Sequence, residues 1–322
     1  LLALRAMSPY SPSSAAPSVC SSGDFPEIFE GPEKTLSLCF KTRRLSRRSL
    51  RLFPNEAWTE ILKHVKCTSL STADSTAPML ATSSKEKVIK SMGVTAYLLS
   101  ESSLFVMDNS VVLKSRGRTT PLMAVEPILD LAVPSWRTKA PAHYLKYATF
   151  MRLGYMRPAE QLEPHTSWTQ EVQHLDKYFQ GEAALCGSGS TSMQHVYVAN
   201  YLRKGEIIDT VSTQVVLTHL DTTESTRRVG KAFDRMSEEE FPLMKMWKDL
   251  HGDDKFSPTN NAKLDECFFQ PIGYSANGVF GRNFTTVHIT PQPGCSYLSV
   301  ETPQRSLVLS CGAALRRPAR HL

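Results

Sequence analysis

The residues best suited to chemistry lie in the stretch 97–105, where three serines and one glutamate separate two apolar blocks. The blocks, 95–99 and 104–106, are typical of strand ends, so the hydroxyls are expected in a tight bend between paired strands. A serine hydroxyl held in such a bend can attack the carbonyl of its own preceding peptide bond and convert that amide to an ester. The other interpretation of these residues is an ordinary serine-rich hairpin turn.

The stretch closely resembles the processing site of the eukaryotic S-adenosylmethionine decarboxylase proenzymes. In that family the chain cuts itself between the glutamate and the following serine, which here are Glu101 and Ser102. The resemblance implies that β-elimination breaks the ester and leaves Ser102 as a covalent pyruvoyl group, the family's cofactor. This ketone forms a Schiff base with the substrate and acts as an electron sink when carbon dioxide departs, the role of pyridoxal phosphate elsewhere.

Further blocks resemble the same family in the same order. They are 29–34 (Phe-Glu-Gly-Pro-Glu-Lys), 268–278, 287–293, 296–297 and 301–302. Several ordered blocks within residues 25–302 are far more specific than one pentapeptide. The chain is therefore identified as a member of the family, and site roles can be carried over by position.

The resemblance assigns the processing roles first. Ser102 matches the serine that becomes the pyruvoyl group, and Glu101 matches the end of the smaller chain. His288 matches the base that removes the α-proton of the ester, which suits a histidine because its unperturbed pKa of about 6.5 keeps much of it neutral at cellular pH. Ser275 matches a hydroxyl that assists processing through hydrogen bonds.

Substrate contacts are implied in the same way. Phe29 and Phe269 match the two rings between which the adenine stacks, and each such contact is worth about 0.5–1.5 kcal/mol beyond burial. The other positions matched to the substrate-binding and acidic site residues are Leu99, Glu101, Glu30 and Glu33. From the residues alone, the two phenylalanines would be core side chains and His288 a structural histidine.

Two site positions depart from the family pattern. Family members carry a cysteine proton donor where this chain has Arg116, and a guanidinium stays protonated at any ordinary pH. Losing a positioned general acid costs about 10²–10⁴ in rate. Gln292 replaces the glutamate that holds the ribose hydroxyls, and because charge-assisted bonds are roughly twice as strong as neutral ones, we expect weaker substrate binding.

A third departure concerns putrescine, which some family members bind through buried acids. Glu301 and Lys114 are retained. The other matched acidic positions read Ser37, Gln214, and Thr210 (or Asp209 if the register slips by one). Too little negative charge remains to attract a diamine dication, so no putrescine binding or response is expected.

Composition is typical of a globular chain in a reducing compartment, with 41% hydrophobic and 21% charged residues. No apolar run approaches the roughly 18–20 residues of a membrane helix. Seven cysteines, without C-x-x-C pairs, favour neither a metal site nor a disulfide framework. We expect a cytoplasmic protein with no metal, membrane or nucleic-acid partner.

The formal net charge of +6 has a local source in the basic run 41–51. Its cations, without an acid among them, are Lys41, Arg43, Arg44, Arg47, Arg48 and Arg51. The run lacks interleaved aromatic residues and a nucleic-acid fold signature. A solvated loop is therefore favoured over a binding patch.

Periodicity predicts the elements that must position these residues. Helices are expected at 55–65 with Asn55 as the cap, at 122–132 shortened or kinked by Pro127, after a Ser167 cap, and after Ser237. Strands are expected at 94–99, 104–107, 111–114, 196–201, 215–220, 284–290 and 296–301. Short strands and amphipathic helices without a phosphate-binding glycine loop indicate an α+β fold.

The resemblance implies a four-layer α/β/β/α sandwich with two antiparallel sheets and helices outside. Residues 25–302 would form this domain, with its carboxyl-terminal strands missing. Residues 1–24 would be a disordered leader or a gene-model artefact, and residues 303–322 an unassigned tail.

The favoured hypothesis is a self-processing, pyruvoyl-dependent decarboxylase that converts S-adenosylmethionine to its decarboxylated form and CO2 for spermidine and spermine biosynthesis. The alternative is a catalytically impaired paralogue that regulates an active decarboxylase. Either would form a homodimer or a heterodimer with a paralogue.

Overall fold

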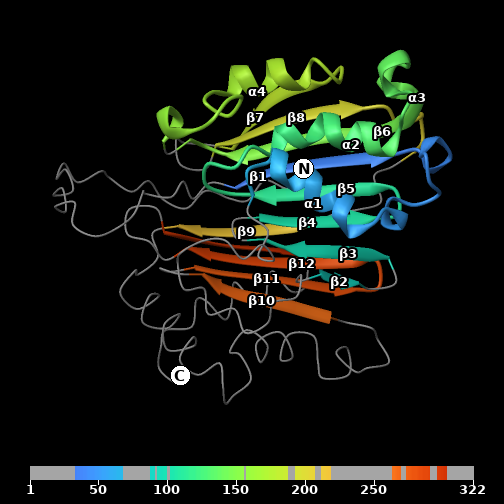
Figure 1. The fold of residues 1–322 in the computed structure, drawn as a ribbon. Helices are drawn as coiled ribbons and strands as arrows, with labels where there is room; N and C mark the ends of the chain where they lie inside the picture. Colours follow the sequence, from blue (N-terminus) through green and yellow to red (C-terminus); the bar gives the residue numbers. More distant parts are fainter. Residues whose placement is uncertain are drawn as a thin grey trace.

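The structure, a computed structural model, describes residues 33–67, 88–90, 93–99, 102–155, 157–187, 193–206, 212–218, 263–269, 273–290 and 296–302. Within these residues two antiparallel sheets pack face to face, and a layer of helices covers the outer face of the larger sheet (Figure 1). The predicted α+β sandwich is confirmed. The helix expected after Ser237 and the tails 1–24 and 303–322 lie outside the described residues.

The larger sheet has eight strands in the order β2-β3-β4-β5-β1-β6-β8-β7, and the smaller has five in the order β10-β11-β12-β13-β9. The strands of the larger sheet are β1 Lys34–Phe40, β2 Val88–Lys90, β3 Val94–Leu98, β4 Ser102–Met107, β5 Ser110–Ser115, β6 Leu145–Leu153, β7 Glu182–Cys186 and β8 Gln194–Asn200. Those of the smaller sheet are β9 Thr213–Thr218, β10 Lys263–Phe269, β11 Gly273–Phe280, β12 Asn283–Thr290 and β13 Tyr297–Thr302.

The helix layer consists of α1 Asn55–His64, α2 Val125–Ala132, α3 Pro141–Tyr144 and α4 Trp168–Leu175, with 3-10 turns η1 Thr42–Arg44, η2 Leu50–Leu52, η3 Pro121–Ala124, η4 Trp136–Thr138 and η5 Pro158–Glu160. The main core lies between this layer and the larger sheet. There Leu36 and Leu38 of β1 are buried in one cluster with Trp58 of α1 and Leu129 of α2. Full burial of each such side chain contributes about 1.5–3 kcal/mol. The basic run 41–51 is mostly exposed, as expected of a solvated loop.

The residues at which helices α4 and α1 begin can be compared with the predicted N-caps. Ser167 caps α4, because its hydroxyl accepts a 3.3 Å hydrogen bond from the Gln170 amide. The predicted cap of α1 is wrong: Pro54 occupies that position, and the Asn55 side chain instead accepts a 3.1 Å bond from the Tyr97 hydroxyl. Pro127 lies in the first turn of α2, where its missing N–H costs no helical bond, so the α-helix begins at Val125 and not at Leu122.

Alternate side chains of strand β4 lie on opposite faces of the larger sheet. Leu104 and Val106 belong to the helix-side core, whereas Phe105 stacks on Phe284 of β12 with ring centroids 3.9 Å apart. Since successive strand side chains point to opposite faces, the neighbours Ser102 and Ser103 must diverge as well. Ser102 therefore faces the helices, and Ser103 faces the smaller sheet.

Candidate active site

A buried polar cluster lies between the two sheets, centred on His288 of β12. Its Nδ1 is 2.7 Å from Oε1 of Glu33, the residue before β1, and its Nε2 is 3.1 Å from the Ser103 Oγ. His288, Glu33 and Ser103 are all buried. A carboxylate, an imidazole and a hydroxyl thus form one chain of contacts from β1 to β4.

The protonation of His288 follows from its partners. The Glu33 Oε1 also accepts hydrogen bonds from the Tyr297 hydroxyl at 3.0 Å and the Ser299 hydroxyl at 2.7 Å. Burial alone would raise the pKa of Glu33, but the charge of Lys114 and the bond from His288 hold it well below its usual value. An ionised Glu33 requires the proton of His288 on Nδ1, which leaves the Nε2 lone pair directed at Ser103.

The imidazole is also kept neutral. Burial, followed by the charge of Arg116, lowers the pKa of His288 to about 4, although Glu33 opposes this shift. The imidazole is therefore unprotonated over the whole physiological range. The Ser103 hydroxyl has one proton for two acceptors, the His288 Nε2 and the Asn277 Oδ1 at 2.8 Å.

An ion triad supports the cluster. Lys114 of β5 lies 3.2 Å from Glu33 Oε2 and also pairs with Glu301 of β13. Burial opposes the charged form, but Glu301 and Glu33 outweigh it and raise the pKa of Lys114. Ser212 donates a 2.6 Å hydrogen bond to Glu301, and Gln214 donates one to Glu33. The triad joins the two sheets at the site.

Arg116 reaches the same cluster. Its Nη2 donates a 2.9 Å hydrogen bond to the Ser275 Oγ, and its Nη1 lies 3.3 Å from the Thr290 hydroxyl. The guanidinium is 5.6 Å from the centroid of the Tyr297 ring. Ser275 is the register partner of His288 across β11 and β12. The structure therefore brings together Arg116, Ser275 and His288, which the resemblance matched to site positions.

Ser102 lies on the opposite face of β4 from His288. Its Oγ is 2.9 Å from the Sγ of Cys67, and its backbone oxygen accepts a 3.0 Å bond from the Leu99 amide. Ser102, Cys67 and Leu99 are buried. Ser103 and Asn277 lie within the matched blocks 97–105 and 268–278 but were given no role, and Cys67 lies outside every block. Their partners are 35 to 185 residues away in the chain, so sequence alone does not pair them.

The remaining predicted site residues stay predictions. Glu101, Glu30, Phe29 and Gln292 lie outside the described residues. Phe269 is the last residue of β10, and its side chain is not among those described.

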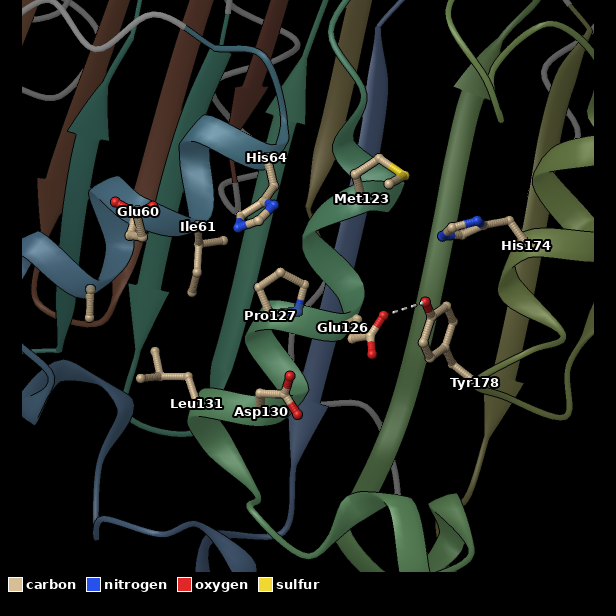
Figure 2. Close-up of a pocket in the computed structure, with 11 residues that line it drawn as sticks. Glu60, Ile61, His64, Met123, Glu126, Pro127, Asp130, Leu131, His174 and Tyr178 are labelled. Carbon is tan, nitrogen blue, oxygen red and sulfur yellow. Dashed lines mark hydrogen bonds between the residues drawn. The ribbon is translucent and has the colours of Figure 1, made fainter.

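A surface pocket of about 580 Å³ opens on the helix layer between α1, α2 and α4 (Figure 2). Glu126 accepts a 3.3 Å bond from Tyr178 there, and Glu126 and Asp130 both pair with Arg137. Glu126 and Asp130 are thus already paired with a cation. It lies on the far side of the larger sheet from His288, so it is not the candidate active site.

Within the described part of the chain, no three His, Cys, Asp or Glu side chains are grouped to hold a metal ion. None of the helices described there is long and apolar enough to cross a membrane.

The fold and the site define an α+β sandwich that holds a neutral, carboxylate-oriented histidine between its sheets. The sequence profile of the family Adenosylmethionine decarboxylase matches residues 26–310. The chain belongs to that family.

Several similar proteins are named S-adenosylmethionine decarboxylase proenzyme. That of Dictyostelium discoideum is 28% identical over 88% of this chain and 69% of its own length, and that of Saccharomyces cerevisiae is 30% identical over 87% and 74%. That of Xenopus laevis is 29% identical over 85% and 75%. A solved Trypanosoma brucei AdoMetDC-delta26 monomer is similar at 22% identity, with a TM-score of 0.40 over 62% of this chain and 69% of its own.

Proposed function

We propose that this chain is a self-processing decarboxylase. It cuts itself between Glu101 and Ser102 and then removes carbon dioxide from S-adenosylmethionine, giving decarboxylated S-adenosylmethionine for spermidine and spermine biosynthesis. The proposal is supported by family membership and by one observation above others: a neutral histidine with a directed lone pair lies beside the start of β4, where Ser102 is buried.

The first step is an exchange of bonds within the chain. The Ser102 Oγ forms a bond to the carbonyl carbon of Glu101, and the bond from that carbon to the Ser102 nitrogen breaks. The hydroxyl proton ends on the nitrogen, so atoms balance without another reactant. Burial of Ser102 excludes water that would otherwise compete for the Glu101 carbonyl.

The second step is elimination. His288 takes the α-proton of Ser102, the bond from Cβ to Oγ breaks, and the Glu101 carboxylate leaves. The contacts of β4 support this geometry, because the Ser102 Oγ points to the helices and His288 lies on the other face. A base and a leaving group on opposite sides suit an anti elimination. Hydrolysis of the product, with loss of ammonia, leaves the pyruvoyl group.

The surroundings of Ser102 fit this group. The position is fully buried at a strand end, and hydroxyl and amide groups of Ser103 and Asn277 follow on the inter-sheet face. A pyruvoyl group supplies an electron sink for decarboxylation. Around it, Glu33 and Tyr297 would keep His288 in one tautomer, while Arg116 adds a fixed positive charge.

A second candidate is a catalytically impaired paralogue that regulates an active decarboxylase within a heterodimer. One observation favours it: Arg116, buried against Ser275, occupies the position of the family's proton donor. In both candidates S-adenosylmethionine is the ligand.

The two candidates differ in turnover. Release of labelled carbon dioxide from carboxyl-labelled S-adenosylmethionine should be measured for the full chain and for Ser102→Ala. Release by the full chain alone supports the decarboxylase. A chain that cuts itself but releases no carbon dioxide supports the regulatory paralogue.

A further inference from the structure

A thiol touches the hydroxyl on which the proposed self-cleavage depends. Cys67 Sγ lies 2.9 Å from Ser102 Oγ, in hydrogen-bonding range for either atom as donor. Ser102 is fully buried and Cys67 is 7% exposed, so solvent does not compete for this contact. The reaction steps above assign Cys67 no role.

A second polar side chain, that of Ser115, lies on the same face of the sheet as the Ser102 hydroxyl. Ser115 is the register partner of Ser102 across β4 and β5, so the two side chains share the helix-side face with Cβ atoms about 4.5–5.5 Å apart. Its hydroxyl is fully buried and has no hydrogen-bond partner among the described residues. Burial of an unpaired hydroxyl is costly, so this position is unfavourable unless the hydroxyl acts on a neighbour.

The surroundings are otherwise apolar. On the same face of β4 and β5 lie Leu104 and Leu113, both part of the main core cluster. The Ser102 Oγ thus sits in a small polar pocket, formed with Cys67 and Ser115, inside a hydrophobic core.

The backbone after α1 holds Cys67 in this pocket. Lys66 has a φ of 58°, a left-handed conformation that a non-glycine residue adopts only at a cost. On one side of it, the Val65 oxygen accepts a 2.8 Å bond from the Thr120 amide, and Thr120 Oγ1 donates to the His64 oxygen. The strained turn, tied down in this way, points residue 67 at β4.

We propose that Cys67 and Ser115 orient the Ser102 hydroxyl for attack on the Glu101 carbonyl. The inference rests on the proposed self-cleavage. Cys67 Sγ accepts the hydroxyl proton in a hydrogen bond, which turns an oxygen lone pair toward the carbonyl, and the Ser115 hydroxyl, unpaired among the described residues, offers a second acceptor for that proton on the same face. The bond changes are those of the ester-forming step. Cys67 and Ser115 end it unchanged, so both are positioning residues.

The test follows self-cleavage of the full chain after cell-free synthesis, by intact mass against time. We expect Cys67→Ala to slow cleavage about tenfold, equivalent to about 1.4 kcal/mol of barrier. Cys67→Ser, which keeps a hydrogen-bonding group, should stay within about threefold of the parent, and Ser115→Ala should slow cleavage by a few-fold. The matched control is Cys39→Ala, a thiol equally buried but on β1, which should cleave at the parent rate.

Hydroxylamine separates the two steps, because it cleaves an accumulated ester without elimination. It should leave Cys67→Ala slow, since the ester forms slowly there, and it should restore cleavage of His288→Ala. Parent-rate cleavage by Cys67→Ala, or its rescue by hydroxylamine, would overturn the inference while the proposed function stood. An uncut parent chain would overturn the proposed function, and this inference with it. Thermal unfolding of each variant shows whether it is folded, and Cys67→Ser keeps the test decisive if the alanine variant is not.

Discussion

The protonation of one residue, His288, governs the chemistry available to this site. Its neutral form with the proton on Nδ1 follows from an ionised Glu33, and its low pKa follows from burial and from Arg116. The same depressed pKa affects stability. As the pH falls, the histidine of the unfolded chain is protonated at about pH 6.5, whereas that of the folded chain is protonated only at about pH 4. The contribution of His288 to the free energy of unfolding is therefore complete above about pH 6.5 and is lost as the pH falls toward 4.

The rate of self-cleavage should therefore change little in mildly acidic solution. The cleavage rate can be measured by pH jump and intact mass. We expect this rate to stay constant from pH 8 down to about 5.5 and to fall as His288 is protonated near pH 4. Arg116→Ala removes a charge that lowers this pKa, so its acid limb should move to higher pH. A parent inflection near 6.5 would show that the histidine is not held neutral.

Restoring the proton donor should raise turnover. Arg116→Cys is expected to increase the decarboxylation rate about 10²–10⁴-fold, the usual contribution of a positioned general acid. The matched control is Arg118→Cys, because Arg118 is exposed two residues away. Equal rates for the parent and Arg116→Cys would mean that another group already donates the proton.

The motifs predicted several site residues but not the partners of these residues. Arg116, Ser275, His288 and Glu33 were predicted from motifs, and the structure brings them together. The divergence of Ser102 and Ser103 was missed, because the start of β4 was expected at Leu104, after both serines. Which face a strand residue takes depends on register, and the register was set by distant strands.

At the level of elements, helix α4 depends on its cap. Ser167→Ala removes a bond to the Gln170 amide and should lower the free energy of unfolding by about 1 kcal/mol, measured by urea denaturation. The control is Ser135→Ala, since Ser135 precedes η4 without capping it and is exposed. That change should stay within about 0.5 kcal/mol. An equal loss in both variants would refute the cap.

Elements whose apolar residues recur with a clear helix or strand period were predicted well. Helix α1 and strands β3, β5 and β12 agree with their expected ranges within two residues. Strands β6, β7, β10 and β11 were not predicted. In β10 and β11, residues such as Asp265, Glu266 and Asn277 interrupt the strand pattern, and sheet pairing overrides that local signal.

At the level of the whole molecule, the Lys114 triad holds the two sheets together. Glu33 comes from the β1 side and Glu301 from β13. Lys114→Met leaves two buried carboxylates without their cation, and we expect a loss of about 3–5 kcal/mol in the free energy of unfolding. The control, Lys63→Met, breaks an exposed pair with Glu60 and should cost about 0–1 kcal/mol. Similar losses in the two variants would mean that the triad does not stabilise the assembly of sheets.

The triad also bears on putrescine. Glu33 and Glu301 already pair with Lys114, and Gln214 is neutral where an acid was matched. We expect putrescine at millimolar concentration to leave the rates of self-cleavage and decarboxylation unchanged. Acceleration that saturates with putrescine would contradict this expectation.

Self-cleavage is tested first by the intact mass of the purified, folded chain. We expect two chains separated between Glu101 and Ser102, with a pyruvoyl group at the start of the larger one, and a single uncut chain for Ser102→Ala. A single uncut chain from the folded parent protein would show that the protein does not process itself.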